Sequence, residues 1–123
     1  LQASLSAAAV VAESTNGNPS AFRQVMAPIV GASPKKRFAS ASLWRLGRPA
    51  RQIVRIGARP QLTTQSPARA AALFRRATGK KSFVVADLLE HAFRKGCRAG
   101  GEVIDAIVFH EFSPVALLYR PTP

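Results

Sequence analysis

The chain is short of acidic residues. It has 18 Lys and Arg residues against only six Asp and Glu in 123 residues, a formal net charge of +12. Residues 35–81 contain thirteen of the basic residues and no acidic one. A run of like charges repels itself in water until a polyanion neutralises it, and nucleic acid is the commonest polyanion. The imbalance therefore favours a polyanionic partner.

Cysteine and long hydrophobic runs are also scarce. The only cysteine, Cys97, excludes an internal disulfide and favours a reducing compartment. No run of 18 apolar residues occurs, so the sequence predicts no transmembrane helix. His91, Cys97 and His110 are the only soft metal ligands, and their spacing matches no zinc signature. Together with the lack of a catalytic or phosphate-loop motif, this predicts no enzyme activity, no metal and no cofactor.

Arginine dominates the basic residues, with 13 Arg against five Lys. The planar guanidinium suits phosphate and stacks on bases, and aromatic side chains such as Trp44 and Phe38 stack on unpaired bases. The sequence therefore predicts an rRNA-binding segment. Its candidate contact residues are Lys35, Lys36, Arg37, Arg45, Arg48, Arg51, Arg55, Arg59, Arg69, Arg75, Arg76, Lys80, Lys81 and Trp44.

The first sixty residues are rich in Ala, Ser and Arg, and Glu13 is their only acid. That composition is typical of organellar transit peptides, and residues 36–40 resemble a presequence processing site. Residues 13–20 and 57–67 have too few apolar side chains to become ordered on their own. We therefore expect an organellar subunit whose segments are held by a large assembly.

Punctuation by proline and glycine divides the chain into three parts. Residues 1–34 form an apolar N-terminal segment with short helices, expected over 1–12 and over 21–30, the latter capped by Asn18 and shortened by Pro28. Residues 35–65 form an extended basic segment in which Pro and Gly exclude a long regular element. The even spacing of Arg51, Arg55 and Arg59 would place them on one side of an extended chain.

Residues 66–123 give the clearest local signals. Ser66 and Pro67 predict the start of a helix over 68–78, and a second amphipathic helix is expected over 83–95. Residues 103–112 and 115–120 read as an antiparallel hairpin, with a helix over 102–112 as the alternative. The predicted fold class is α+β: a small two-helix plus β-hairpin C-terminal unit with a long irregular basic N-terminal extension.

These patterns favour a non-catalytic structural subunit of an organellar ribosome, in the mitochondrial matrix rather than a plastid. Its expected partners are rRNA and neighbouring protein subunits, with no small-molecule substrate. The alternative is an accessory subunit of a mitochondrial respiratory or ATP synthase membrane complex. There the arginines would contact acidic subunits and anionic lipid, and the apolar residues 1–30 would favour a membrane setting.

Overall fold

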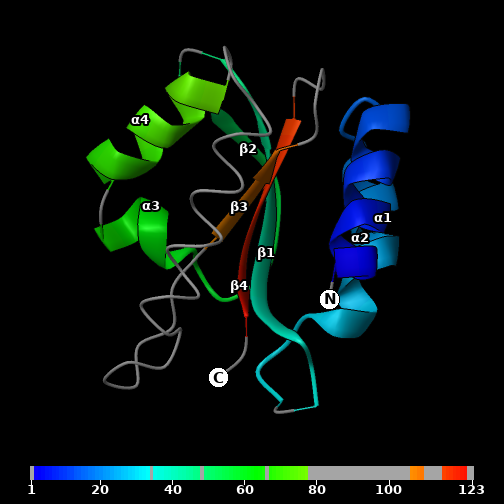
Figure 1. Ribbon diagram of the computed structural model, residues 1–123. Coiled ribbons are helices and arrows are strands. Elements are labelled where there is room, and N and C mark those ends of the chain that lie inside the picture. The colour runs from blue at the N-terminus through cyan, green and yellow to red at the C-terminus, as the bar shows by residue number, and fades with distance from the viewer. Residues whose placement is uncertain are drawn as a thin grey trace.

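A computed structural model describes residues 2–33, 35–47, 49–65, 67–77, 106–109 and 115–121. Within these residues an antiparallel four-stranded sheet, in the order β2-β1-β4-β3, lies between two layers of helices (Figure 1). The strands are β1 (Phe38–Arg45), β2 (Arg51–Gly57), β3 (Ala106–Phe109) and β4 (Val115–Pro121). The helices are α1 (Gln2–Ser14), α2 (Pro19–Met26), the 3₁₀ turn η1 (Ala27–Ile29), α3 (Gln61–Gln65) and α4 (Pro67–Ala77). The architecture agrees with the expected α+β class.

The turn between α1 and α2 is closed by local hydrogen bonds. The Gly17 N–H donates to the Ala12 carbonyl at 2.7 Å and the Asn16 N–H to the Glu13 carbonyl at 3.2 Å. This pair of bonds is a Schellman motif, in which Asn16 takes the left-handed position at φ 53°. The Asn18 side chain then accepts from the Ala21 N–H at 3.1 Å and caps α2. Residues 13–20 are therefore ordered, contrary to the expectation from their composition.

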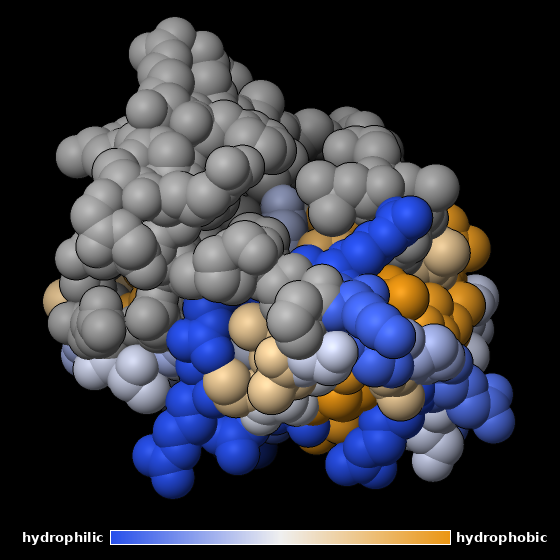
Figure 2. Space-filling view, turned by 90° about the horizontal axis from the view of Figure 1, so that it is seen from below, coloured by the Kyte–Doolittle hydropathy of each residue, from blue (hydrophilic) through white to orange (hydrophobic). Residues whose placement is uncertain are grey.

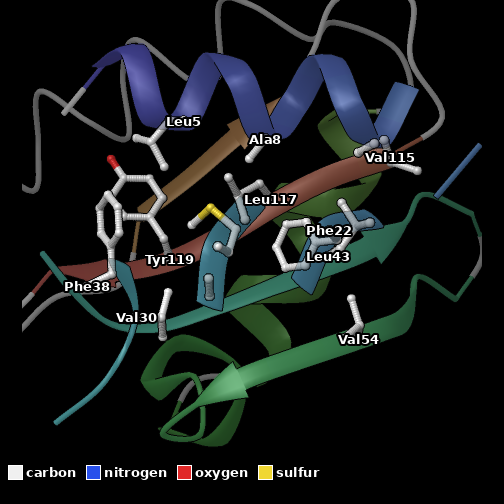
Figure 3. Packing of buried hydrophobic residues seen from close by; sticks show 13 residues of the cluster. Leu5, Ala8, Phe22, Val30, Phe38, Leu43, Val54, Val115, Leu117 and Tyr119 are labelled. Atoms are coloured by element: carbon white, nitrogen blue, oxygen red, sulfur yellow. The ribbon is translucent and has the colours of Figure 1, made fainter. Parts of the chain in front are cut away.

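The face of the sheet beneath α1 and α2 carries the larger hydrophobic core. Phe22 and Met26 of α2 are completely buried, and Leu5 and Ala8 point from α1 toward the same cluster (Figure 3). The sheet adds alternate residues of its central strands, which lie on one face because side chains alternate along a strand. They include Phe38, Ala41 and Leu43 of β1, Val54 of β2, and Val115, Leu117 and Tyr119 of β4.

The opposite face packs a smaller cluster against α3 and α4. Ala70 and Phe74 of α4 contact Ala116 and Leu118 of β4, and Trp44 and Leu62 join them from the edge of the cluster. The Trp44 ring lies over the Phe74 ring with centroids 5.2 Å apart and a tilt of 31°. Thus α4, which the sequence predicts from Pro67 onward, is held to the sheet by an aromatic pair.

The structure corrects the expected irregularity of the basic segment. Two strands, β1 and β2, occupy much of residues 35–65, and α3 follows at residues 61–65 within the polar stretch 57–67. The reason is pairing: β1 is hydrogen-bonded to β2 on one side and to β4 on the other. Prolines and glycines lie at the ends of these strands rather than within them, so they delimit regular elements instead of excluding them.

The expected helices and hairpin fare better. Helix α2 ends at Met26 and continues as a 3₁₀ turn through Pro28, as a proline in that position predicts. Strands β3 and β4 pair antiparallel, with Val108 opposite Leu117, so the hairpin rather than the helical alternative is confirmed over the described residues 106–109. The helix expected over 83–95 lies outside the described residues.

Candidate nucleic-acid interface

Basic residues from three separate segments meet at one end of the sheet. Lys35, Lys36 and Arg37 directly precede β1, and Arg59 follows β2, where the Ala58 N–H donates to the Ala39 carbonyl at 3.1 Å. Arg120 of β4 lies opposite Ser40, in the first half of β1. We call these five residues the basic end. It lies at the bottom of Figure 1, near the C-terminus of the chain.

Most side chains of the basic end face solvent. Lys35, Arg37 and Arg59 are exposed, whereas Arg120 is half-buried. Lys36 is half-buried, and its Nζ donates to the Pro28 carbonyl at 2.7 Å, which fixes it against the turn after α2. Figure 2 shows the molecule from below, with strongly hydrophilic side chains around smaller hydrophobic patches. The surface can therefore present several cations to phosphates at once.

A second group of basic residues lies at the opposite end of the sheet. Arg45 ends β1 directly opposite Arg51, which begins β2, and both are remote from Lys35. Seven residue steps along β1 separate the two ends, about 23 Å at ~3.3 Å per residue. Arg45 is half-buried and donates to the Asn16 carbonyl at 2.9 Å, so part of its capacity ties the turn after α1 to the sheet. The predicted basic run therefore folds into two separated groups.

The even spacing of the β2 arginines does not place them on one face. Arg51 lies opposite Arg45, whereas Arg55 lies opposite Ser42, and residues directly opposite each other share a face. Arg45 and Ser42 are three positions apart on β1, so they point to opposite faces. The register shifts between Leu43 and Trp44, where β2 holds an extra residue, and this irregularity reverses the alternation.

The two aromatic residues expected to stack on bases have structural roles. Phe38 is completely buried and packs edge-on against Tyr119, with ring centroids 5.4 Å apart. Trp44 is half-buried against Phe74, and its Nε1–H donates to the Ser42 Oγ at 2.7 Å. Phe38 therefore belongs to the core, and one side of Trp44 is occupied by protein.

The remaining predicted contacts divide into placed and unplaced ones. Arg51, Arg55 and Arg75 are exposed. Arg69 and Arg76 lie on α4. Nothing further is described of the side chains of Arg69 and Arg76, and Arg48, Lys80 and Lys81 lie outside the described residues. Sequence reasoning missed Arg120, because only the pairing of β4 with β1 brings it beside the basic end.

Other kinds of site receive little support from the described part of the chain. No three His, Cys, Asp or Glu side chains gather there to hold a metal ion, and His91, Cys97 and His110 lie outside it. Nor is any helix among the described residues long and apolar enough to cross a membrane. Glu13, on α1, is the only acidic residue that the structure describes. The described surface is thus basic with almost no counterbalancing acid.

Comparison with protein-family models, with curated proteins and with solved structures finds no match to this chain. The candidate interface is therefore defined by its own geometry: a basic α+β protein whose cations gather at the ends of a helix-covered sheet.

Proposed function

We propose that this protein is a non-catalytic structural subunit of an organellar ribosome, favoured in the mitochondrial matrix, and that it binds rRNA phosphates. The supporting observation is the basic end, where the pairing of β1 with β2 and β4 gathers five cations from three segments. Clustered Lys and Arg side chains release counterions when they neutralise phosphates, which supplies most of the affinity of such surfaces. In this proposal residues 66–123 contact neighbouring protein subunits.

The fold dictates how the interface must be tested. Deleting residues 35–60 would remove both β1 and β2, and with them half of the strands of the described sheet. Loss of assembly in such a deletion would report unfolding rather than loss of RNA contacts. Charge-neutralising substitutions at exposed positions leave the strands intact and are therefore the informative variants.

The first experiment compares two double variants of equal charge. Lys35→Gln with Arg59→Gln removes two exposed cations from the basic end, and Arg51→Gln with Arg75→Gln removes two exposed cations elsewhere. Binding of a labelled single-stranded RNA is measured across a salt series. The basic-end double is expected to lower the slope of log K against log[salt] by about 1.4, at ~0.7 per phosphate contact. Equal losses in both doubles would contradict the assignment to this end.

The second experiment addresses the assembly. Tagged full-length protein is sedimented from an organelle lysate with and without RNase. Co-migration with ribosomal particles that RNase disrupts is the expected result. Migration with a detergent-solubilised membrane complex, unchanged by RNase, would instead favour an accessory subunit of a respiratory or ATP synthase complex. The apolar residues of α1 no longer favour that alternative, because Leu5, Ala8 and Ala12 are buried against the sheet.

A further inference from the structure

A cavity of about 430 Å³ lies on the α4 side of the sheet, away from the basic end. It is enclosed by α4, the start of that helix, Thr63 of α3 and the loop between β1 and β2. This volume falls in the range of small-molecule sites, roughly 300–1,000 Å³. The cavity is built from residues that the proposed RNA-binding function does not use, apart from Trp44 and Arg75.

One wall of the cavity is aromatic and held in place. Trp44 and Phe74 both line it, with their ring centroids 5.2 Å apart. The hydrogen bond from Trp44 Nε1 to Ser42 Oγ, at 2.7 Å, fixes the orientation of the indole. Phe74 is almost completely buried in the same cluster. The aromatic surface is therefore preformed, and a flat or chain-like apolar group gains contact area there without ordering these rings.

The opposite walls are formed by small side chains. Ala50 of the β1–β2 loop, together with Ala70 and Ala71 of α4, lines the space facing the aromatic pair. Ala70 is buried, whereas Ala50 and Ala71 are half-buried and accessible from the cavity mouth. Larger apolar residues at these positions would fill the space. The sequence instead leaves room beside two large rings, and a ligand can supply the missing contacts.

A cation accompanies this apolar lining. Arg75 lines the cavity and is exposed, so its guanidinium is accessible at the mouth. The only acidic residue among the described ones, Glu13, belongs to α1, which packs on the other face of the sheet. The whole chain adds a positive field with its net charge of +12. An occupant of this cavity is therefore selected for an apolar body and a negative charge.

We propose that the cavity binds a small amphipathic anion. Its apolar body lies between Trp44, Phe74 and the alanine wall, and its acidic group pairs with Arg75. The occupant is a bound ligand rather than a substrate, because the lining offers no nucleophile or acid–base pair among the described residues. This inference does not depend on RNA binding, since its pocket lies away from the basic end.

Trp44 makes the test direct, because it is the only tryptophan in the chain and lines the cavity. Full-length protein is titrated with 8-anilinonaphthalene-1-sulfonate and with N-phenyl-1-naphthylamine, which has the same aromatic body without the sulfonate. We expect saturable one-to-one binding of the sulfonate with quenching of Trp44 emission. The neutral probe should bind roughly three- to five-fold more weakly, as expected for one exposed ion pair. Absence of saturable binding to the wild type would overturn the proposal.

Variants place the probe in the cavity. Ala71→Phe and, from the facing loop, Ala50→Phe fill the space and should each weaken sulfonate binding by on the order of ten-fold. Ala7→Phe, at an exposed position of α1 on the other side of the sheet, is the matched control and should leave binding unchanged. Circular dichroism verifies folding, and two filling variants from different elements guard against misfolding of either one. Wild-type affinity in both folded filling variants would contradict the site.

The charge is tested in the same titration. Arg75→Gln should remove the preference for the sulfonate over the neutral probe, while Arg55→Gln, an exposed arginine of β2 outside the cavity, should preserve it. A preference that persists in Arg75→Gln would overturn the anionic class. RNA binding of Ala71→Phe should equal that of the wild type, which separates the outcome of this proposal from that of the proposed function.

Discussion

The two faces of the sheet differ in how completely they are filled. The face under α1 and α2 carries thirteen buried residues, including Phe22, Met26 and Phe38 without any exposure. The face under α3 and α4 carries four, with half-buried neighbours and a cavity of about 430 Å³. Both faces use the same central strands, β1 and β4. The contrast indicates that one face stabilises the fold and that the other has room for a binding site.

The largest expected effect compares one phenylalanine from each face. Phe22→Ala should lower the free energy of unfolding by about 3–5 kcal/mol, because the ring is buried on all sides. Phe74→Ala should cost less, on the order of 2 kcal/mol, because that ring already borders an empty space on one side. Urea denaturation of both variants measures the difference. Equal losses would show that the two faces are packed alike.

Local sequence signals predicted the elements that depend on local chemistry. Asn18, Pro19 and Pro28 correctly delimit α2, because capping and the missing proline N–H act within a few residues. Pro67 marks the start of α4. The hairpin of β3 and β4 was also predicted, since its strands are adjacent in the sequence. Each of these predictions needs only short-range information.

Strands β1 and β2 were missed for identifiable reasons. Ser40 and Ser42 are buried although they are polar, so β1 lacks the alternation that marks a half-buried strand. In β2 the irregularity opposite Leu43 and Trp44 interrupts the alternation. The basic end depends on the pairing of Arg120 with Ser40, eighty residues apart. The cavity likewise depends on tertiary packing, so neither site could be located from sequence.

Two glycines provide the next comparison. Gly57 has φ +81°, and a Cβ there would lie 2.4 Å from the Ala39 carbonyl and 2.9 Å from Val30 of the larger core. Gly57→Ala should therefore cost at least about 2 kcal/mol. Gly47, beside the cavity, would place a Cβ 3.6 Å from the Pro49 carbonyl, an ordinary contact. Thermal unfolding should show little change for Gly47→Ala, and a matching loss there would contradict this account.

A smaller effect is expected at Ser42, on the cavity side of the sheet. Its Oγ accepts the Trp44 Nε1–H at 2.7 Å and reaches the Leu118 carbonyl at 3.5 Å. Ser42→Ala should cost about 1–2 kcal/mol, because it leaves the indole N–H of a half-buried ring without its acceptor. Trp44 emission should change together with the urea midpoint. An unchanged spectrum would show that the hydrogen bond does not hold the indole in solution.

Ser40 should give the smallest effect and the opposite sign, although it is two positions from Ser42 and equally buried. Its Oγ has no hydrogen-bond partner among the described residues, so the folded state bears the cost of removing a hydroxyl from water. Ser40→Ala should therefore be neutral or stabilise the protein by up to about 1 kcal/mol in urea denaturation. A loss as large as that of Ser42→Ala would show that the Ser40 hydroxyl is hydrogen-bonded in solution. The opposite signs of the two substitutions would establish that stability on this face depends on satisfying individual polar groups, whereas the filled face depends on apolar volume.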